Sequence, residues 1–187
     1  MKAPPLVLAL FAGVCLLQWA VPASMIHKRE STLHHGEIYR FKTAPVDPYD
    51  AFRGRYVALN YEESTVAGTW PREDFRRGRV VFAVLGTDEE GFAVIENLVT
   101  APPEEGDFLR VRVGYVYSDR IRIELPFDRF YMDEFSAPEA EREFLRANRN
   151  GGAEPAHVVA RVRRGFGVIE DLIVGGQPVA EWLEGRR

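Results

Sequence analysis

The chain has one cysteine in 187 residues, and that cysteine, Cys15, lies inside the apolar N-terminal run. The rest of the sequence therefore has no thiol for a disulfide, a cysteine nucleophile or a thiolate metal site. A domain without thiols suits an oxidising compartment. Lysine is also scarce, since only Lys2, Lys28 and Lys42 occur. The net charge of −4 gives no basic excess of the kind that nucleic-acid-binding proteins carry, so no nucleic-acid partner is predicted.

The N-terminal residues contain a long apolar run. An uncharged stretch extends from Ala3 to Ile26 and is followed by the polar sequence His27-Lys28-Arg29-Glu30. About 20 apolar residues suffice for a helix to cross a bilayer. Trp19 lies near the distal end of the run, where aromatic side chains favour the membrane interface. We therefore predict a single membrane-spanning helix over residues 6–26.

The alternative for this segment is a cleaved signal peptide, because Val21-Pro22-Ala23 resembles a small-residue cleavage site. The apolar run is longer than a typical signal-peptide core, which favours an uncleaved anchor. Residues 1–30 are then the membrane anchor and its flank, and residues 31–187 are one domain. In the usual orientation, both alternatives place this domain outside the cytoplasm, on the periplasmic or extracellular side.

Most of the remaining chain has the pattern of β-strands. Apolar or alternating runs are joined by short polar loops with glycine, which predicts hairpins. The predicted segments are Val80 to Leu85, Phe92 to Val99, the hairpin Leu109 to Leu125, His157 to Arg163 and Phe166 to Val174. Because the first of these runs is apolar throughout, we expect it to be buried on both faces.

The register of the hairpin from Leu109 to Leu125 follows from its alternation. A three-residue loop, Ser118-Asp119-Arg120, places Tyr115 opposite Ile123 and keeps one face apolar, with the arginines on the solvent face. A two-residue loop places Tyr115 opposite Arg122 and mixes apolar and charged residues. The pattern therefore predicts the three-residue loop.

One short helix is predicted in the C-terminal third. Ser136-Ala137-Pro138-Glu139 matches a capping box with proline in the first turn, and Asn150-Gly151-Gly152 ends the helix. The chain after Gly175-Gly176 is expected to be a tail that carries Trp182. The predicted fold class is mainly β, a β-rich α+β: an N-terminal transmembrane helix, then one compact β domain with one short packed helix.

The stretch DPYDAFRGRYVALNYE, from Asp47 to Glu62, begins with turn chemistry and ends in a strand. Proline fixes the backbone, aspartate bonds to nearby main-chain groups, and Gly54 permits a conformation that other residues resist. In the strand that follows, Leu59 and Tyr61 share one face, which we expect to enter the core. Tyr56 lies on the other face, which is free for a groove, a partner or water.

Residues 54–61, GRYVALNY, resemble the signature of the GDYXXLXY family, with glycine, tyrosine, leucine and tyrosine at the same spacing. Two further segments resemble that family: RFYMDEFSAPEAERE at residues 129–143 and GFGVIEDLIVGGQPV at residues 165–179. The family's aspartate after the glycine is Arg55 here, so no role that needs a carboxylate carries over to this position. The resemblance implies an envelope-associated bacterial protein beside a multipass membrane protein, and it supplies no catalytic residues.

Known catalytic and metal-binding patterns do not fit the sequence. RGRVVF at residues 77–82 resembles type I signal peptidases, but their Ser/Lys pair needs a serine where Val46 stands and a lysine in the later strands. The adjacent His34 and His35 would point to opposite faces of a strand, and His157 is isolated, so no metal site is predicted. The carboxylates of residues 133–143 are assigned to helix capping and pairing.

The candidate site residues are binding and motif positions, and the tyrosines and arginines among them are the usual anchors of a contact surface. They are Asp47, Asp50, Arg53, Gly54, Arg55, Tyr56, Leu59, Tyr61, Arg129, Tyr131 and Glu134. The predicted function is a non-catalytic binding or accessory subunit of an integral membrane protein, without a cofactor. Two alternatives stay open. One is a hydrolase with an unrecognised carboxylate or hydroxyl site on a fold distantly like the signal peptidase core; the other is a purely structural envelope protein.

Overall fold

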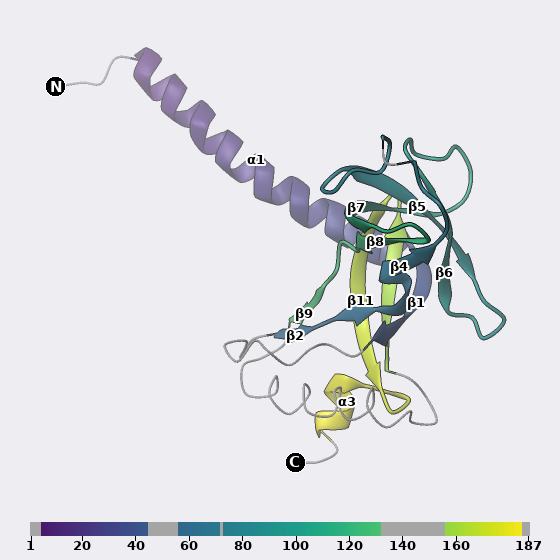
Figure 1. Ribbon diagram of the computed structural model, residues 1–187. Coiled ribbons are helices and arrows are strands. Elements are labelled where there is room, and N and C mark those ends of the chain that lie inside the picture. The colour runs from purple at the N-terminus through teal and green to yellow at the C-terminus, as the bar shows by residue number, and fades with distance from the viewer. Residues whose placement is uncertain (1–4, 45–55, 72, 132–155, 185–187) are drawn as a thin grey trace.

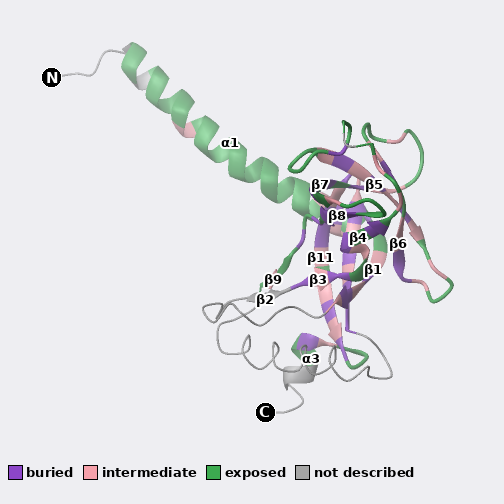
Figure 2. Ribbon diagram, in the orientation of Figure 1, coloured by how far each residue is buried: buried purple, intermediate pink, exposed green. Residues whose placement is uncertain are grey.

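The computed structural model describes residues 5–44, 56–71, 73–131 and 156–184. A single helix, α1 (Pro5–His35), projects from a β domain (Figure 1). The segment Ala9–His35 of this helix is long and apolar enough to cross a membrane, as judged by length and composition. Its side chains are exposed over nearly the whole length that projects from the domain (Figure 2). The prediction of an apolar N-terminal helix is confirmed.

In the described residues, two five-stranded sheets and one two-stranded ribbon form the β domain. The first sheet has the order β12-β11-β10-β1-β3, the second has the order β4-β8-β7-β5-β6, and β2 pairs with β9. The strands are β1 (Glu37–Ala44), β2 (Tyr56–Ala58), β3 (Asn60–Tyr61), β4 (Thr65–Ala67), β5 (Val80–Thr87), β6 (Ala93–Val99), β7 (Phe108–Val116), β8 (Arg120–Glu124), β9 (Arg129–Tyr131), β10 (His157–Arg163), β11 (Phe166–Val174) and β12 (Gln177–Pro178). A 3-10 turn, η1 (Glu62–Ser64), carries the chain from the first sheet into the second. The predicted fold class, mainly β behind an N-terminal helix, is confirmed.

One continuous core joins the two sheets. It is built from the alternate, inward-facing residues of most strands, as the buried segments in Figure 2 show. At its centre Phe41 is fully buried, with ring centroids 6.0 Å from Tyr61 and 5.2 Å from Phe127 in edge-to-face arrangements. Such aromatic pairs contribute about 0.5–1.5 kcal/mol beyond the burial of their area.

The last turns of α1 pack on β10 and β11 of the first sheet. Thr32 is buried at 2% exposure, and the guanidinium of Arg163 donates to the hydroxyl and the main-chain oxygen of Ser31. The Lys28 ammonium lies 4.2 Å from the ring centroid of Phe166. Because β1 begins two residues after α1 ends, the helix enters the domain without a linker. These contacts fix the direction in which the helix leaves the domain.

The predicted register of the β7–β8 hairpin is wrong. Tyr115 lies opposite Arg122, and the Tyr117 N–H donates to the Arg120 oxygen at 2.8 Å across a two-residue loop. A β-bulge at Gly114 shifts the register by one residue. On the other side of the bulge, Val113 lies opposite Ile123, so apolar residues again lie opposite each other. A bulge adds one residue to one strand only, so both the short loop and the apolar face are accommodated.

Three further expectations can be compared with the structure. The strands predicted at residues 157–163 and 166–174 are confirmed with the same bounds. The prediction that β5 is buried on both faces is wrong. Val81, Ala83 and Leu85 are buried, but the residues that alternate with them are only half-buried or exposed.

The prediction of a C-terminal tail is also wrong, because residues 179–184 form the short helix α3 (Val179–Glu184). Its first residue, Val179, is completely buried and holds this turn against the core. The helix predicted at residues 136–150 lies outside the described residues.

Candidate functional site

The two segments singled out by the sequence are hydrogen-bonded neighbours. Strand β2 carries the third to fifth residues of the GRYVALNY signature, and β9 carries the first three residues of RFYMDEF. Their register pairs Tyr56 with Tyr131, Val57 with Phe130 and Ala58 with Arg129. The ribbon therefore brings together residues that lie more than seventy positions apart in the chain.

The predicted site residues divide into core and surface positions. Leu59 and Tyr61 are buried at 7% and 3% exposure, as predicted. Burial raises the pKa of Tyr61 well above its ordinary value, so its hydroxyl is a hydrogen-bond donor at neutral pH. Arg129 and Tyr131 are exposed, Tyr131 at 67%. The other candidates that lie outside the described residues are Asp47, Asp50, Arg53, Gly54, Arg55 and Glu134.

A groove of about 340 Å³ lies between β9, β11 and the end of α1. We call it the helix-end groove. Its lining includes Arg29 from α1, Arg129, Phe130 and Tyr131 from β9, and Phe166 and Ile169 from β11. Arg29 follows closely on the uncharged stretch that ends at Ile26. Two of the predicted contact residues therefore lie in a groove next to the apolar segment.

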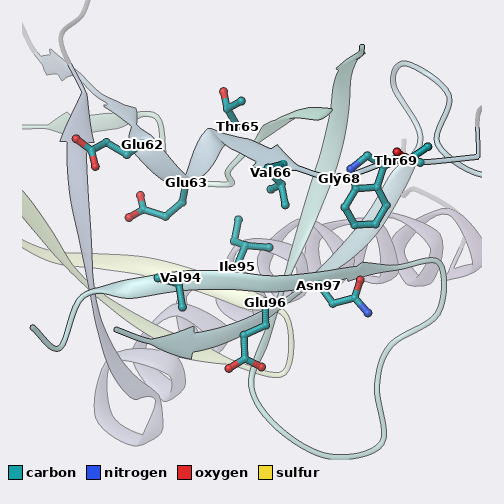
Figure 3. Close-up of a pocket in the computed structure, with 12 residues that line it drawn as sticks. Glu62, Glu63, Thr65, Val66, Gly68, Thr69, Val94, Ile95, Glu96 and Asn97 are labelled. Atoms are coloured by element: carbon teal, nitrogen blue, oxygen red, sulfur yellow. The ribbon is translucent and has the colours of Figure 1, made fainter. Parts of the chain in front are cut away.

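A second and larger cavity, of about 650 Å³, lies between the chain from η1 to Trp70 and strand β6. We call it the edge cleft, because β4 and β6 are the two edge strands of the second sheet and both line it. Figure 3 shows Val66 and Ile95 facing each other across it, with Glu63 at one end and Thr69 at the other. The sequence reasoning did not predict this cavity.

Two buried polar atoms in the edge cleft have no hydrogen-bond partner. They are Glu63 Oε2 and Trp70 Nε1, and they are the only such side-chain atoms in the described part of the chain. Burial raises the pKa of Glu63 to about 7, and the nearby Glu62 carboxylate adds to the rise. Main-chain N–H groups of Glu63 and Lys42 and the Lys42 charge oppose it.

Neither Glu63 nor Trp70 was among the predicted site residues. One signal was available in the sequence, because the acidic pair Glu62-Glu63 follows directly after the signature that ends at Tyr61. An acidic pair behind a buried strand has to lie at a surface or in a cavity, since charged groups are costly to bury without partners.

The histidines and acidic groups that the structure describes do not gather into a metal site. No group of three or more His, Cys, Asp or Glu side chains in these residues is placed to hold an ion. His157 is buried and packs edge-to-face on Phe92, with ring centroids 5.3 Å apart. His34, at the end of α1, lies 3.5 Å from Glu30.

Comparison with known proteins gives one match. None of the curated proteins and none of the solved structures matches the chain. The model of the family described as GDYXXLXY protein matches residues 18–172. The matched range includes most of α1, both strands of the β2–β9 ribbon and both lining segments of the edge cleft. The chain belongs to the GDYXXLXY family.

Proposed function

We propose that this chain is a single-pass membrane protein whose β domain is a non-catalytic binding or accessory subunit of an integral membrane protein. Residues 1–30 are the anchor and its flank, and residues 31–187 are the domain, held outside the cytoplasm. The observation that carries the proposal is the helix-end groove, which places predicted contact residues beside the end of the apolar helix.

The position of the groove selects the kind of partner. Helix α1 runs directly into β1, and its last turns are held to β10 and β11 through Arg163, Ser31 and Lys28. The groove therefore keeps a fixed distance from the bilayer once α1 is inserted. A partner that fills it must itself expose a surface close to the membrane, as an integral membrane protein does.

The chemistry of the groove fits a protein interface. Phe130, Phe166 and Ile169 provide apolar surface in its lining, and Arg29 and Arg129 provide positive charge. Tyr131 is the most exposed of the aromatic side chains in the groove. Arginine and tyrosine around a small apolar centre are typical of residues that contribute most to binding energy.

The test is capture of the partner from crosslinked, detergent-solubilised membranes with the full-length chain as bait. We expect one stoichiometric integral membrane protein, reduced at least tenfold by Tyr131→Ala. The matched control is Tyr117→Ala, because Tyr117 is 48% exposed and lies outside the groove. Both variants are first shown to fold by circular dichroism. Absence of any partner above background, or equal capture by both variants, contradicts the proposal.

The hydrolase alternative has one observation in its favour. Glu63 has a pKa of about 7 in the edge cleft, and a general acid or base works best when its pKa is near the working pH. Figure 3 shows, however, that Glu96 and Thr65 point away from Glu63. Of the residues drawn there, the adjacent Glu62 provides a second carboxylate near Glu63, but no hydroxyl lies beside it. A screen of hydrolase substrates with the wild-type chain and Glu63→Gln decides this alternative, since turnover lost in the variant would support it.

A further inference from the structure

The edge cleft separates two strands that belong to one sheet. In the order β4-β8-β7-β5-β6 each neighbouring pair is antiparallel, so β4 and β6 run in the same direction. Both line the cleft, and they do not pair with each other. A strand between them that runs antiparallel to both would continue the alternation of the sheet and close it.

The main chain of β6 directs hydrogen-bonding groups into the cleft. The Leu85 N–H donates to the Asp107 oxygen on the β7 side at 2.9 Å, and Leu85 lies opposite Ile95. In an antiparallel ladder, two kinds of opposite residue pair alternate. In one kind the two residues hydrogen-bond to each other; in the other kind their main-chain N–H and C=O groups point away from the partner strand. The Ile95 N–H and carbonyl therefore point away from β5. A second hydrogen bond agrees: the Asp88 N–H donates to the Phe92 oxygen at 2.8 Å, so that pair is hydrogen-bonded. Three pairs back along the ladder, Leu85 and Ile95 are again a pair that is not hydrogen-bonded to each other.

The main chain of β4 does the same from the opposite side. The Gly68 N–H donates to the Asp119 oxygen at 2.9 Å, so the neighbouring pair, Ala67 with Arg120, is not hydrogen-bonded to each other. The main-chain groups of Ala67 therefore point away from β8. Thr65, two residues earlier in β4, has the same orientation. Thr65, Ala67 and Ile95 all line the cleft. The Thr65 N–H donates to the Glu62 oxygen in the 3-10 turn, so at Thr65 only the carbonyl is open to an added strand. For Ala67 and Ile95, the described residues provide no main-chain hydrogen bond to the outward groups.

The side chains of the cleft define the chemistry of its occupant. Glu62, Glu63 and Glu96 are in the lining, and the described lining contains no lysine or arginine. The unpartnered Glu63 Oε2 accepts hydrogen bonds from a cation when ionised, and the unpartnered Trp70 Nε1 can only donate. The Trp70 ring packs on Phe75, with centroids 5.0 Å apart, so it is held in place.

These observations fit a peptide better than a small cation. An extended peptide offers carbonyl oxygens for Trp70 and alternating main-chain groups for both edges, and it offers a basic side chain for Glu63. We infer that the edge cleft binds an extended segment of a partner protein by strand addition between β4 and β6, with a lysine or arginine side chain at Glu63. This site is separate from the helix-end groove and does not depend on the function proposed for it. Strand addition at unpaired sheet edges is a general mode of peptide recognition.

The inference is tested by isothermal titration of the full-length chain in detergent micelles with synthetic peptides. The probe is an acetylated, amidated heptapeptide of alternating threonine and lysine. One control peptide has glutamate in place of lysine, and two others carry N-methyl groups on either the threonine or the lysine residues. We expect the basic peptide to bind, and we expect the acidic peptide and both methylated peptides to bind at least tenfold more weakly.

The methylated peptides separate strand addition from charge attraction alone. They keep the charge but lose the main-chain donors of one edge or the other, and they are tested on the unaltered protein, so no folding defect can explain the result. Equal binding of the methylated peptides, or equal binding of spermine, overturns strand addition and identifies a site for cations in general. No binding of the basic peptide overturns the inference.

A protein variant tests the role assigned to the carboxylate. Glu63→Gln keeps the shape of the side chain and removes its charge, so affinity for the basic peptide should fall at least fivefold. The matched control is Glu124→Gln, an exposed carboxylate on β8 that does not line the cleft. Unchanged affinity in Glu63→Gln contradicts the placement of the basic side chain.

Discussion

The hydroxyl of Tyr61 donates a 2.7 Å hydrogen bond to the main-chain oxygen of Phe127, and both residues are buried. Their rings also meet edge-to-face with centroids 5.6 Å apart. Tyr61 is the last residue of the GRYVALNY signature, and Phe127 comes two positions before β9. The final tyrosine of the signature therefore holds the chain that leads into β9 inside the core, which is a structural role.

Replacing Tyr61 with phenylalanine should destabilise the domain. The ring is retained, but the buried Phe127 carbonyl loses its donor, which costs about 1–3 kcal/mol of unfolding free energy. Urea unfolding of the full-length chain in detergent measures the effect. The control is Tyr117→Phe at a half-exposed position, for which we expect a change within about 0.5 kcal/mol. Equal effects of the two variants would show that the Tyr61 bond contributes little.

The stability of the domain should depend on the ionisation of Glu63. Its pKa is 4.5 without the protein environment and about 7 in the folded chain. A carboxyl group with a raised folded pKa favours folding fully below the lower value and loses that contribution as pH rises through the higher one. The unfolding free energy should therefore fall between about pH 4.5 and pH 7, by on the order of 2 kcal/mol for this partly exposed group.

The comparison of wild type with Glu63→Gln isolates this effect from other titrating groups. Above pH 7.5 the variant should be the more stable of the two, and the difference should vanish near pH 4.5. Thermal unfolding of the full-length chain across this pH range gives both curves. A constant difference between them at every pH would mean that folding does not raise the pKa of Glu63.

The packing of α1 on the sheet should depend on Arg163. Its guanidinium donates to Ser31, and the adjacent Gly36 N–H donates to the Thr32 oxygen at 2.8 Å. Arg163→Ala should loosen this helix end and speed amide exchange at residues 32–36 about fivefold, as local opening becomes easier. Hydrogen exchange with mass spectrometry measures it. Arg110→Ala, an exposed arginine on the other sheet, is the control and should leave these amides unchanged.

The local parts of the fold were predictable because they follow from alternation. The bounds of β10 and β11 follow from the apolar pattern around Arg164-Gly165. The β7–β8 register was not predicted, because a bulge breaks the period of two that the argument assumed. Gly114 was the available sign, since glycine inside a strand often marks a bulge.

The candidate sites were predictable only in part, because they depend on which strands meet. Arg129 and Tyr131 were identified from their resemblance to a family segment, and the structure adds that they line one groove together with Arg29. The edge cleft requires the order of five strands, which the alternation of single strands does not specify. Glu63 and Trp70 became notable only when their burial and missing partners were known.

The side of the membrane on which the domain lies can be tested with the one cysteine of the chain. Cys15 lies in the apolar helix, so Cys15→Ser gives a background without thiols. Ser118→Cys then places a single thiol in the exposed β7–β8 turn. A charged maleimide cannot cross the bilayer, and we expect it to label this thiol in intact cells. Lys2→Cys on the same background should be labelled only after permeabilisation. The reverse pattern would place the domain in the cytoplasm and remove the proposed extracytoplasmic partner.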